Sequence, residues 1–338
     1  VADGGPAGDP DVEPEPMREV NFATLSREDL KLQMVEPYTP TAAPDDYRCF
    51  LLPWPYEDTR YITGFGITPG NVQVVHHVAA FLIPPDRVAQ YQAWDDADPE
   101  PGYSCFGGPS GPGALPEVNL AGMILHAWSP GGPGTDFPEG TGMKVEPGSY
   151  IALQVHYNIL FNDPEPDQST VVFKVDEEVE HEAFVQLWAD PNWYLGLNMD
   201  IPAGDSDVTH TYEVDPWNFP PPLQVFWPHK LVRIYKVATH MHLLGTHATA
   251  YIDRPDGTRD CLLDRPQYDF NWQRFYTLKD YVELRPGDRL GVECHFDNSA
   301  ENQPLLDGVP MEPTDVNWGE ESTQEMCMGF FYVVTLDE

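Results

Sequence analysis

The chain has 338 residues, which exceeds the usual span of one hydrophobic core, so two domains of roughly 150 residues each are expected. Its 18 Lys and Arg stand against 55 Asp and Glu, a formal net charge of −37 that argues against nucleic acid as a partner and acts chiefly as a solubility device. Hydrophobic residues make up 41%, enough for packed cores, yet no run of about 20 apolar residues occurs, so no transmembrane segment is expected.

The chain opens with an acidic tail rich in Pro and Gly over residues 1–20, which we expect to be flexible. The 36 prolines and 27 glycines of the chain fall mostly between short apolar runs, which is typical of a β-sandwich with long loops, so the predicted fold class is all-β. The charged stretch Asp176–Glu182 indicates a domain boundary near residue 179, between domains over 21–178 and 179–338, or else the solvated edge of a strand.

Helical pattern is scarce, and two short helices are expected, over Leu25–Met34 and Asp86–Asp96. The expected strands are short, rich in β-branched and aromatic residues, and separated by turns, a pattern that favours a sandwich or jelly-roll architecture. These strands are Val72–Ile83, Ser149–Ile159, Thr170–Val175, Leu231–Ile252 (as two strands), Tyr281–Phe296 and Gly329–Leu336.

Three histidines of the first half of the chain lie within the expected strands Val72–Ile83 and Ser149–Ile159. His76 and His77 are adjacent, and neighbouring residues of a strand point to opposite faces. Both can bind one metal ion only if the strand ends or bulges there, or if the two rings use different nitrogens. Considered alone, the pair also fits one buried and one exposed histidine, and His156 fits a hydrogen-bonded core histidine.

A second group lies in the other half of the chain. His240 and His242 are two residues apart, and such residues share one face of a strand, so both rings can reach one ion, although two polar residues on a wet face give the same pattern. Met326 alone would be core filler, but a thioether is a soft ligand that favours Cu(I) over Zn(II).

Together these residues form two candidate metal sites, one with three imidazoles and one mixed. Zinc in proteins is bound by Cys, His, Asp and Glu rather than by a thioether, and neither site includes the carboxylate found in non-haem iron sites. Copper is the metal that suits both sets. The sets are His76, His77 and His156, and His240, His242 and Met326.

Five cysteines are dispersed along the chain without a C-x-x-C pair, which excludes a zinc knuckle or a thioredoxin-type motif. In an acidic, strand-rich chain they predict two long-range disulfides and one remaining thiol. Such disulfides imply an oxidising compartment, so the protein is expected to be secreted, periplasmic or at the cell surface.

Four motifs occur in a fixed order: HH on a strand, then QVHY, then HxH followed by LG, then EMC near the end. In this order and spacing they resemble the copper type II ascorbate-dependent monooxygenases, over about residues 40–338 and including the ILHAW and GSYIALQVHYN segments. The resemblance implies two jelly-roll-like antiparallel β-sandwich domains, each holding one copper ion, with an open cleft between them.

The resemblance also assigns roles to residues. The three-histidine set matches the copper site that stores and delivers an electron, and the mixed set matches the site where O2 and substrate meet. Gln154 matches a glutamine associated with the route between the sites. The residues expected to carry catalysis are therefore Gln154, His240, His242 and Met326.

The cofactors implied by the resemblance are two copper ions, with ascorbate or another one-electron donor as co-substrate. The resemblance further implies two disulfides and leaves Cys261 without a family partner. The implied pairs are Cys49–Cys105 and Cys294–Cys327.

The chain departs from the peptide-hydroxylating branch of the family at three positions that would bind a substrate carboxylate. Ala238 replaces an Arg, and Met328 and Phe330 replace an Asn and a Tyr. Burying a carboxylate without those partners would cost on the order of several kcal/mol. We therefore expect a small-molecule substrate that is apolar or aromatic, not a glycine-extended peptide.

The sequence leaves other functions open. A secreted copper-binding or copper-delivery protein would keep the ligands without turnover. A secreted adhesion or carbohydrate-binding sandwich would carry the histidines incidentally, and the complete ligand set argues against it.

Overall fold

The computed structural model describes residues 25–43, 45–105, 107–112, 123–130, 132, 134–159, 163–218, 226, 228–270, 272–306 and 309–337. The tail expected over residues 1–20 lies outside this part of the chain. Among the described residues no helix is long and apolar enough to cross a membrane.

The N-terminal half packs two sheets against each other, and the three-histidine set lies on one of them. This five-stranded sheet has the order β5-β2-β9-β4-β6. Its strands are β2 (Asp45–Pro53), β4 (Val75–Ile83), β5 (Tyr103–Ser104), β6 (Ile124–Trp128) and β9 (Tyr150–Asn158). The opposing strands are β1 (Leu30–Gln33), β3 (Arg60–Thr68), β7 (Thr135–Asp136), β8 (Thr141–Val145) and β10 (Thr170–Asp176).

The C-terminal half repeats this layering. A four-stranded sheet of order β12-β17-β14-β15 contains β12 (Val208–Val214), β14 (Gly245–Asp253), β15 (Arg259–Arg265) and β17 (Arg289–Phe296). The strands opposite are β11 (His181–Trp188), β13 (Leu231–His240), β16 (Tyr276–Leu284) and β20 (Met328–Leu336). Smaller elements are α1 (Val88–Ala97), the 3-10 turn η1 (Trp193–Leu195), β18 (Leu305–Leu306) and β19 (Val309–Pro310).

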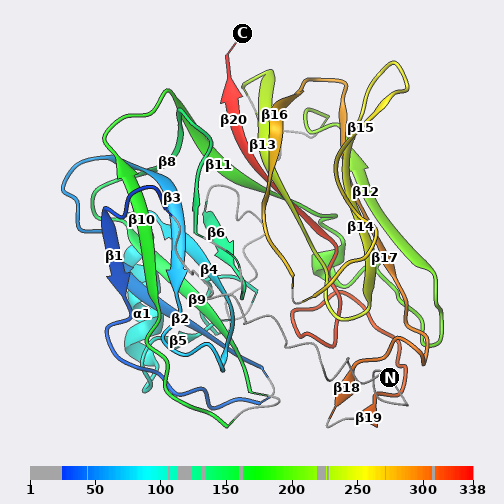
Figure 1. Cartoon of the computed structure of the whole chain (residues 1–338), viewed down its shortest axis with the longest axis horizontal. Helices are drawn as coiled ribbons and strands as arrows, with labels where there is room; N and C mark the ends of the chain where they lie inside the picture. Colours follow the sequence, from blue (N-terminus) through cyan, green and yellow to red (C-terminus); the bar gives the residue numbers. More distant parts are fainter. Residues whose placement is uncertain are drawn as a thin grey trace, which may run out of the picture.

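One large sheet joins the two halves. It has nine strands, in the order β1-β10-β3-β8-β11-β20-β13-β16 with β7 beside β3. The link is a short parallel pairing in which His181 and Glu182 of β11 lie opposite Thr141 and Gly142 of β8. Figure 1 shows the N-terminal strands on the left, the C-terminal strands on the right, and β11 running between them.

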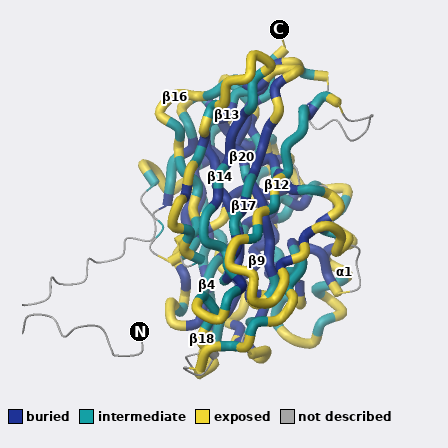
Figure 2. Tube along the Cα trace, turned by 90° about the vertical axis from the view of Figure 1, so that its right-hand side faces the viewer, coloured by how far each residue is buried: buried dark blue, intermediate teal, exposed yellow. Residues whose placement is uncertain are grey.

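Two clusters of buried apolar side chains form the cores, one in each half. In the first, Val155 of β9 and Phe173 of β10 come from opposing sheets; in the second, Ile234 of β13 and Val292 of β17 do the same. Such inward-facing pairs from two layers are what makes a β-sandwich stable. Figure 2 shows the buried segments running through the middle of the molecule, with exposed segments at the turns.

Much of the predicted secondary structure is confirmed. The molecule is nearly all β, and strands are present at Tyr150–Asn158, Thr170–Asp176 and Met328–Leu336. The region Leu231–Ile252 holds two strands, and the helix expected at Asp86–Asp96 is α1. The strand predicted from Val72 begins only at Val75, because residues 72–74 form a turn.

Two predictions were wrong. The helix expected over Leu25–Met34 is absent, and Leu30–Gln33 form β1, which pairs antiparallel with β10. Alternation of partly buried Leu with exposed Lys and Gln fits a sheet edge, so pairing overrides the local preference. The single strand expected over Tyr281–Phe296 is two strands, and the turn at residues 285–288 sends β16 and β17 into different sheets.

Two disulfides tie loops to the sheets. Cys49 of β2 is bonded to Cys105, and Cys294 of β17 is bonded to Cys327, which immediately precedes β20. Cys261 on β15 is a free, exposed thiol. The predicted domain boundary near residue 179 falls in the turn between β10 and β11 and stays a prediction, since β11 and β20 contribute to both buried clusters.

Candidate metal centres

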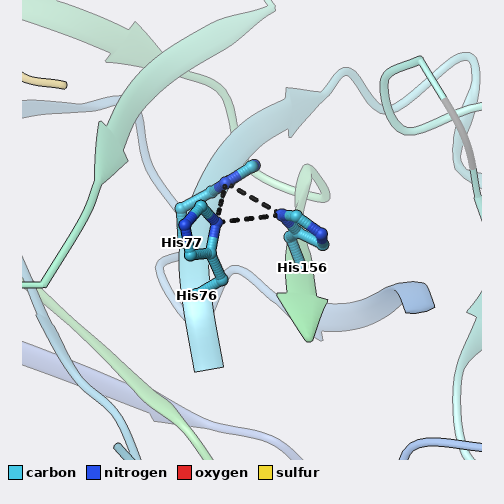
Figure 3. A group of neighbouring side chains, drawn as sticks. All are labelled: His76, His77 and His156. Carbon is cyan, nitrogen blue, oxygen red and sulfur yellow. Dashed lines mark hydrogen bonds between the residues drawn. The ribbon is translucent and has the colours of Figure 1, made fainter. Parts of the chain in front are cut away.

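A β-bulge brings three imidazoles of the first half together. The pairing of β4 with β9 shifts register between Val75 and His77, so His76 is the extra residue and both rings turn toward His156. The three Nδ1 atoms lie 3.1, 3.2 and 3.4 Å from one another. Figure 3 shows them pointing to one common centre.

This spacing fits one metal ion. Three nitrogens at 2.0–2.1 Å from a shared ion lie about 3.3–3.5 Å apart. Burial, followed by the charge of the neighbouring imidazoles, holds the pKa of His77 well below its usual range, so the ring is neutral and its lone pair is available. The three-histidine set therefore has the geometry of a metal ligand set, and its His77 is in the neutral form that binds a metal ion.

The strand beside this cluster orients His156. The Nε2–H group of His156 donates to Asp45 Oδ1 at 2.8 Å, which leaves Nδ1 as the free ligand atom. Burial raises the pKa of Asp45, but the hydrogen bond and the charge of His156, together with hydrogen bonds from Asn158 and Ser322, lower it below its usual value, so the carboxylate stays ionised. The ring of Tyr47 stacks on His156 with centroids 4.1 Å apart and fixes the tilt of the imidazole.

The mixed set lies where β13 ends. His240 is the last residue of the strand and His242 lies just beyond it, so the two are not paired along a strand as predicted. Their ring centroids are nevertheless 5.0 Å apart. His240 Nδ1 donates to the side-chain oxygen of Gln273, and His242 Nδ1 donates to the carbonyl of Gln324 at 3.1 Å. These bonds leave the Nε2 atom of each ring free to bind a metal ion.

Burial sets the protonation state of these two rings. It lowers the pKa of His240 to about 4 and that of His242 to about 3, so both are neutral at physiological pH. Met326 is 4% exposed and borders the same cavity as the two imidazoles. Two neutral imidazoles and a thioether form a soft donor set that suits Cu(I).

A buried carboxylate fixes the loop that carries His242. Glu325 accepts hydrogen bonds from the backbone N–H groups of His242 at 2.8 Å, Leu244 at 2.6 Å and Met326 at 3.3 Å. It is fully buried, so these bonds replace its hydration. Glu325 therefore couples the position of the imidazole to that of the thioether.

Both sets border one cavity of about 310 Å³ between the two halves. His76 and His77 contribute from one side and His240, His242 and Met326 from the other. Phe270 joins them: its ring stacks on His76 with centroids 5.1 Å apart and meets His242 edge-on at 6.0 Å. A cavity of this volume holds a small molecule.

The other predicted site residues also border this cavity. The amide of Gln154 donates to the carbonyl of Gly108 at 2.8 Å. Ala238 lies opposite Phe330, and His240 opposite Met328, in the pairing of β13 with β20. Ala238, Met328 and Phe330 therefore form an apolar wall beside the mixed set.

Several residues of the site escaped the sequence analysis. Asp45, Phe270 and Glu325 contact ligand residues through pairings that no local pattern encodes. A glutamate directly before Met326 was a visible but weak signal.

His247 and His295 stack on each other at 4.9 Å and bond to carboxylates on the far sheet, and they do not border the cavity.

Family models match both halves of the chain. Residues 30–163 match the N-terminal domain of copper type II ascorbate-dependent monooxygenases, and residues 221–335 match the C-terminal domain. The predicted ligand residues of the three-histidine set fall within the first match, and those of the mixed set within the second.

Individual relatives of the chain are also monooxygenases or hydroxylases, and their sequence identity to it is low. The chain is 22% identical to tyramine beta-hydroxylase of Caenorhabditis briggsae, covering 96% of this chain and 52% of the relative. It is 24% identical to DBH-like monooxygenase protein 1 of Homo sapiens (78% and 40%) and 27% identical to peptidyl-glycine alpha-amidating monooxygenase B of Xenopus laevis (76% and 26%). The chain thus spans about half or less of the length of these relatives.

Proposed function

This chain belongs to the copper type II ascorbate-dependent monooxygenases, and on that premise we propose that it hydroxylates a C–H bond of a small molecule with O2. One oxygen atom would enter the C–H bond and the other would leave as water, with two electrons from an external reductant such as ascorbate and two protons completing the balance. Bound copper supplies the one-electron and O2 chemistry that side chains lack.

The observation that carries the proposal is the shared cavity. Residues of both donor sets border one cavity large enough for a substrate, so an electron from the first site could reach the substrate within the protein. The first ion would be held by His76, His77 and His156, and the second by His240, His242 and Met326.

The chain's own groups orient these ligands. Asp45 keeps the proton of His156 on Nε2, while Gln273 and the carbonyl of Gln324 keep the protons of the other two rings on Nδ1. The nitrogen of each ring that is left without a hydrogen bond is therefore the one that we propose to bind the metal ion. Gln154 borders the cavity between the two sets and is proposed to contribute to the route that connects them.

Copper-loaded protein tests the proposal. We expect two copper ions per chain, ascorbate-dependent O2 uptake, and one atom of labelled O2 in the product. His242→Ala should abolish uptake, whereas His229→Ala, which changes a histidine outside the cavity lining, should not. Two bound ions without O2 uptake on any apolar or aromatic substrate would favour the copper-delivery alternative.

The apolar residues of the cavity wall limit the kind of substrate that we propose. Ala238, Met328 and Phe330 offer no donor to a carboxylate, which supports an apolar or aromatic substrate over a glycine-extended peptide. Efficient hydroxylation of such a peptide with copper and ascorbate would refute this part of the proposal.

The compartment follows from the thiol chemistry. Two disulfides fit an oxidising environment. We propose that the protein works outside the cytoplasm, as a secreted, periplasmic or cell-surface protein.

A further inference from the structure

The cavity beside the mixed set is lined by side chains that are easily oxidised. Met326 and Met328 both border it. A thioether is readily converted to a sulfoxide, which is polar and would no longer serve as the soft ligand of the mixed set. An oxidant formed there while no substrate is bound would therefore damage the site, unless other groups supply electrons to it first.

Two aromatic rings lie next to these thioethers. The hydroxyl of Tyr194 lies 3.9 Å from Met328 Sδ, and the backbone of Trp318 pairs with that of Glu325, the residue before Met326. Both rings border the cavity, and their centroids are 4.6 Å apart. Tyrosine and tryptophan give up an electron more easily than any other side chain without sulfur. The two rings are therefore placed to reduce an oxidant at the mixed set.

A buried tryptophan continues this row of rings away from the cavity. Trp193 is 2% exposed, and its ring centroid lies 6.3 Å from that of Trp318, with the ring planes 23° apart. The same indole lies 6.3 Å from the ring of Tyr212. These separations are those of packed aromatic pairs, so each transfer of an electron from ring to ring spans a short distance.

The row ends near the surface of the C-terminal half. Tyr212 lies on β12, the edge strand of the four-stranded sheet, and is partly exposed. Burial and then the charge of Asp190 raise the pKa of Tyr212 to about 12, so the phenol keeps its proton until it is oxidised. The nearby carboxylate of Asp190 can then accept that proton.

We propose that these four rings form an electron relay, which protects the mixed set from an oxidant formed there when no substrate is bound. The relay consists of Trp318, Tyr194, Trp193 and Tyr212. The inference rests on the proposed function in one respect, since it places a copper ion at the mixed set, but it does not depend on hydroxylation. None of the four residues is a proposed metal ligand.

The electrons balance when the oxidant is hydrogen peroxide. Its reduction to two water molecules takes two electrons and two protons. Bound Cu(I) supplies one electron and becomes Cu(II), and the rings beside the cavity supply the other. Trp193 refills those rings and Tyr212 refills Trp193, releasing its phenol proton. An external reductant such as ascorbate then returns an electron and a proton to Tyr212.

Trapping of the tyrosyl radical tests the relay without turnover. Protein loaded with Cu(I) is treated with hydrogen peroxide and a nitroso spin trap, without O2, ascorbate or substrate, and mass spectrometry locates the adducts and the methionine sulfoxides. We expect an adduct on Tyr212. Trp193→Phe keeps an aromatic ring that is much harder to oxidise, so it should lower this adduct at least fivefold and raise sulfoxide at Met326 at least threefold.

Two controls accompany this experiment. Trp217→Phe changes a tryptophan of the same half that lies outside the cavity lining, and it should alter neither yield. His242→Ala, which removes a proposed ligand of the mixed set, should abolish the adduct on Tyr212. An adduct that persists in His242→Ala would come from peroxide in bulk solvent and would overturn the inference.

The remaining outcomes also decide the question. Absence of an adduct on Tyr212 in the unmodified protein overturns the inference, and so does an adduct that survives undiminished in Trp193→Phe. If Trp193→Phe does not fold, Tyr212→Phe removes the last donor and should raise sulfoxide at Met326; an unchanged yield overturns the relay. A working relay in a protein without ascorbate-dependent O2 uptake refutes the proposed function alone, and hydroxylation without the relay refutes this inference alone.

Discussion

At the scale of single residues, ligand geometry depends on carboxylates that bind no metal. Asp45 bonds to a ligand ring, whereas Glu325 bonds to the backbone of the loop that carries His242 and Met326. Partners of this kind typically change metal affinity by about 10–100-fold when they are removed. Asp45 contacts the three-histidine set and Glu325 contacts the mixed set. Replacing one carboxylate should therefore affect one site and leave the other as an internal control.

Glu325→Ala should weaken copper binding at the mixed set about 10–100-fold, because three backbone N–H groups lose their acceptor and the loop relaxes. Affinity of the three-histidine set should be unchanged. Competition titration with a Cu(I) chelator measures the affinities, and X-ray absorption reports the copper–sulfur contact. Glu325→Gln, which keeps the shape, should retain more of that contact than Glu325→Ala, and equal loss at both sites would contradict the assignment.

At the scale of elements, disulfides hold site-bearing loops to strands. The Cys294–Cys327 bond closes a segment of 33 residues and anchors the residue next to Met326 to β17. By chain entropy a loop of this length contributes about 3–4 kcal/mol to the free energy of unfolding.

Replacing both cysteines, in C294A/C327A, should therefore lower the free energy of unfolding by about 3–4 kcal/mol and weaken the mixed site. Urea denaturation and Cu(I) titration measure the two effects. The matched pair C49A/C105A should lower stability as well but leave the mixed site intact. Undiminished affinity in C294A/C327A would show that the loop keeps its position without the covalent tie.

Sequence patterns predicted where strands occur better than they predicted which strands and residues lie side by side. Apolar runs such as Ser149–Ile159 predicted strands because side-chain alternation is local. From the sequence, the adjacent histidines could bind one metal ion only if their strand ended or bulged there. The structure has such a bulge in the pairing of β4 with β9. β1 escaped prediction because it depends on β10, about 140 residues away, and the stacking of Phe270 on His76 likewise arises only from folding.

At the scale of the whole molecule, the junction between the halves contains a buried lysine. Lys236 of β13 is 1% exposed, and its ammonium group lies 5.5 Å from the ring of Phe137 and 5.9 Å from that of Phe275. Within the described residues no carboxylate pairs with it. Burial lowers its pKa from 10.5 to about 8, a penalty of about 3 kcal/mol on the charged form.

Because the pKa of Lys236 is lower in the folded state, the penalty is complete below about pH 8 and disappears as pH rises toward 10.5. Lys236→Met should therefore be more stable than the unmodified protein at pH 7, by up to about 3 kcal/mol, and the advantage should shrink between pH 8 and 10.5. Urea denaturation of copper-free protein across this range measures it. Lys279→Met, at an exposed position of β16, should give no such trend; a constant difference for Lys236→Met would contradict the argument.

The shared cavity has a further consequence for metal loading. Two cations held by residues that border one cavity repel each other, so the affinity of the second ion should be lower than that of the first. The repulsion is greater for two divalent ions than for two monovalent ones, so occupancy of both positions should favour the reduced metal. Divalent ions should then fill the protein in two unequal steps, and monovalent ions in steps that lie closer together.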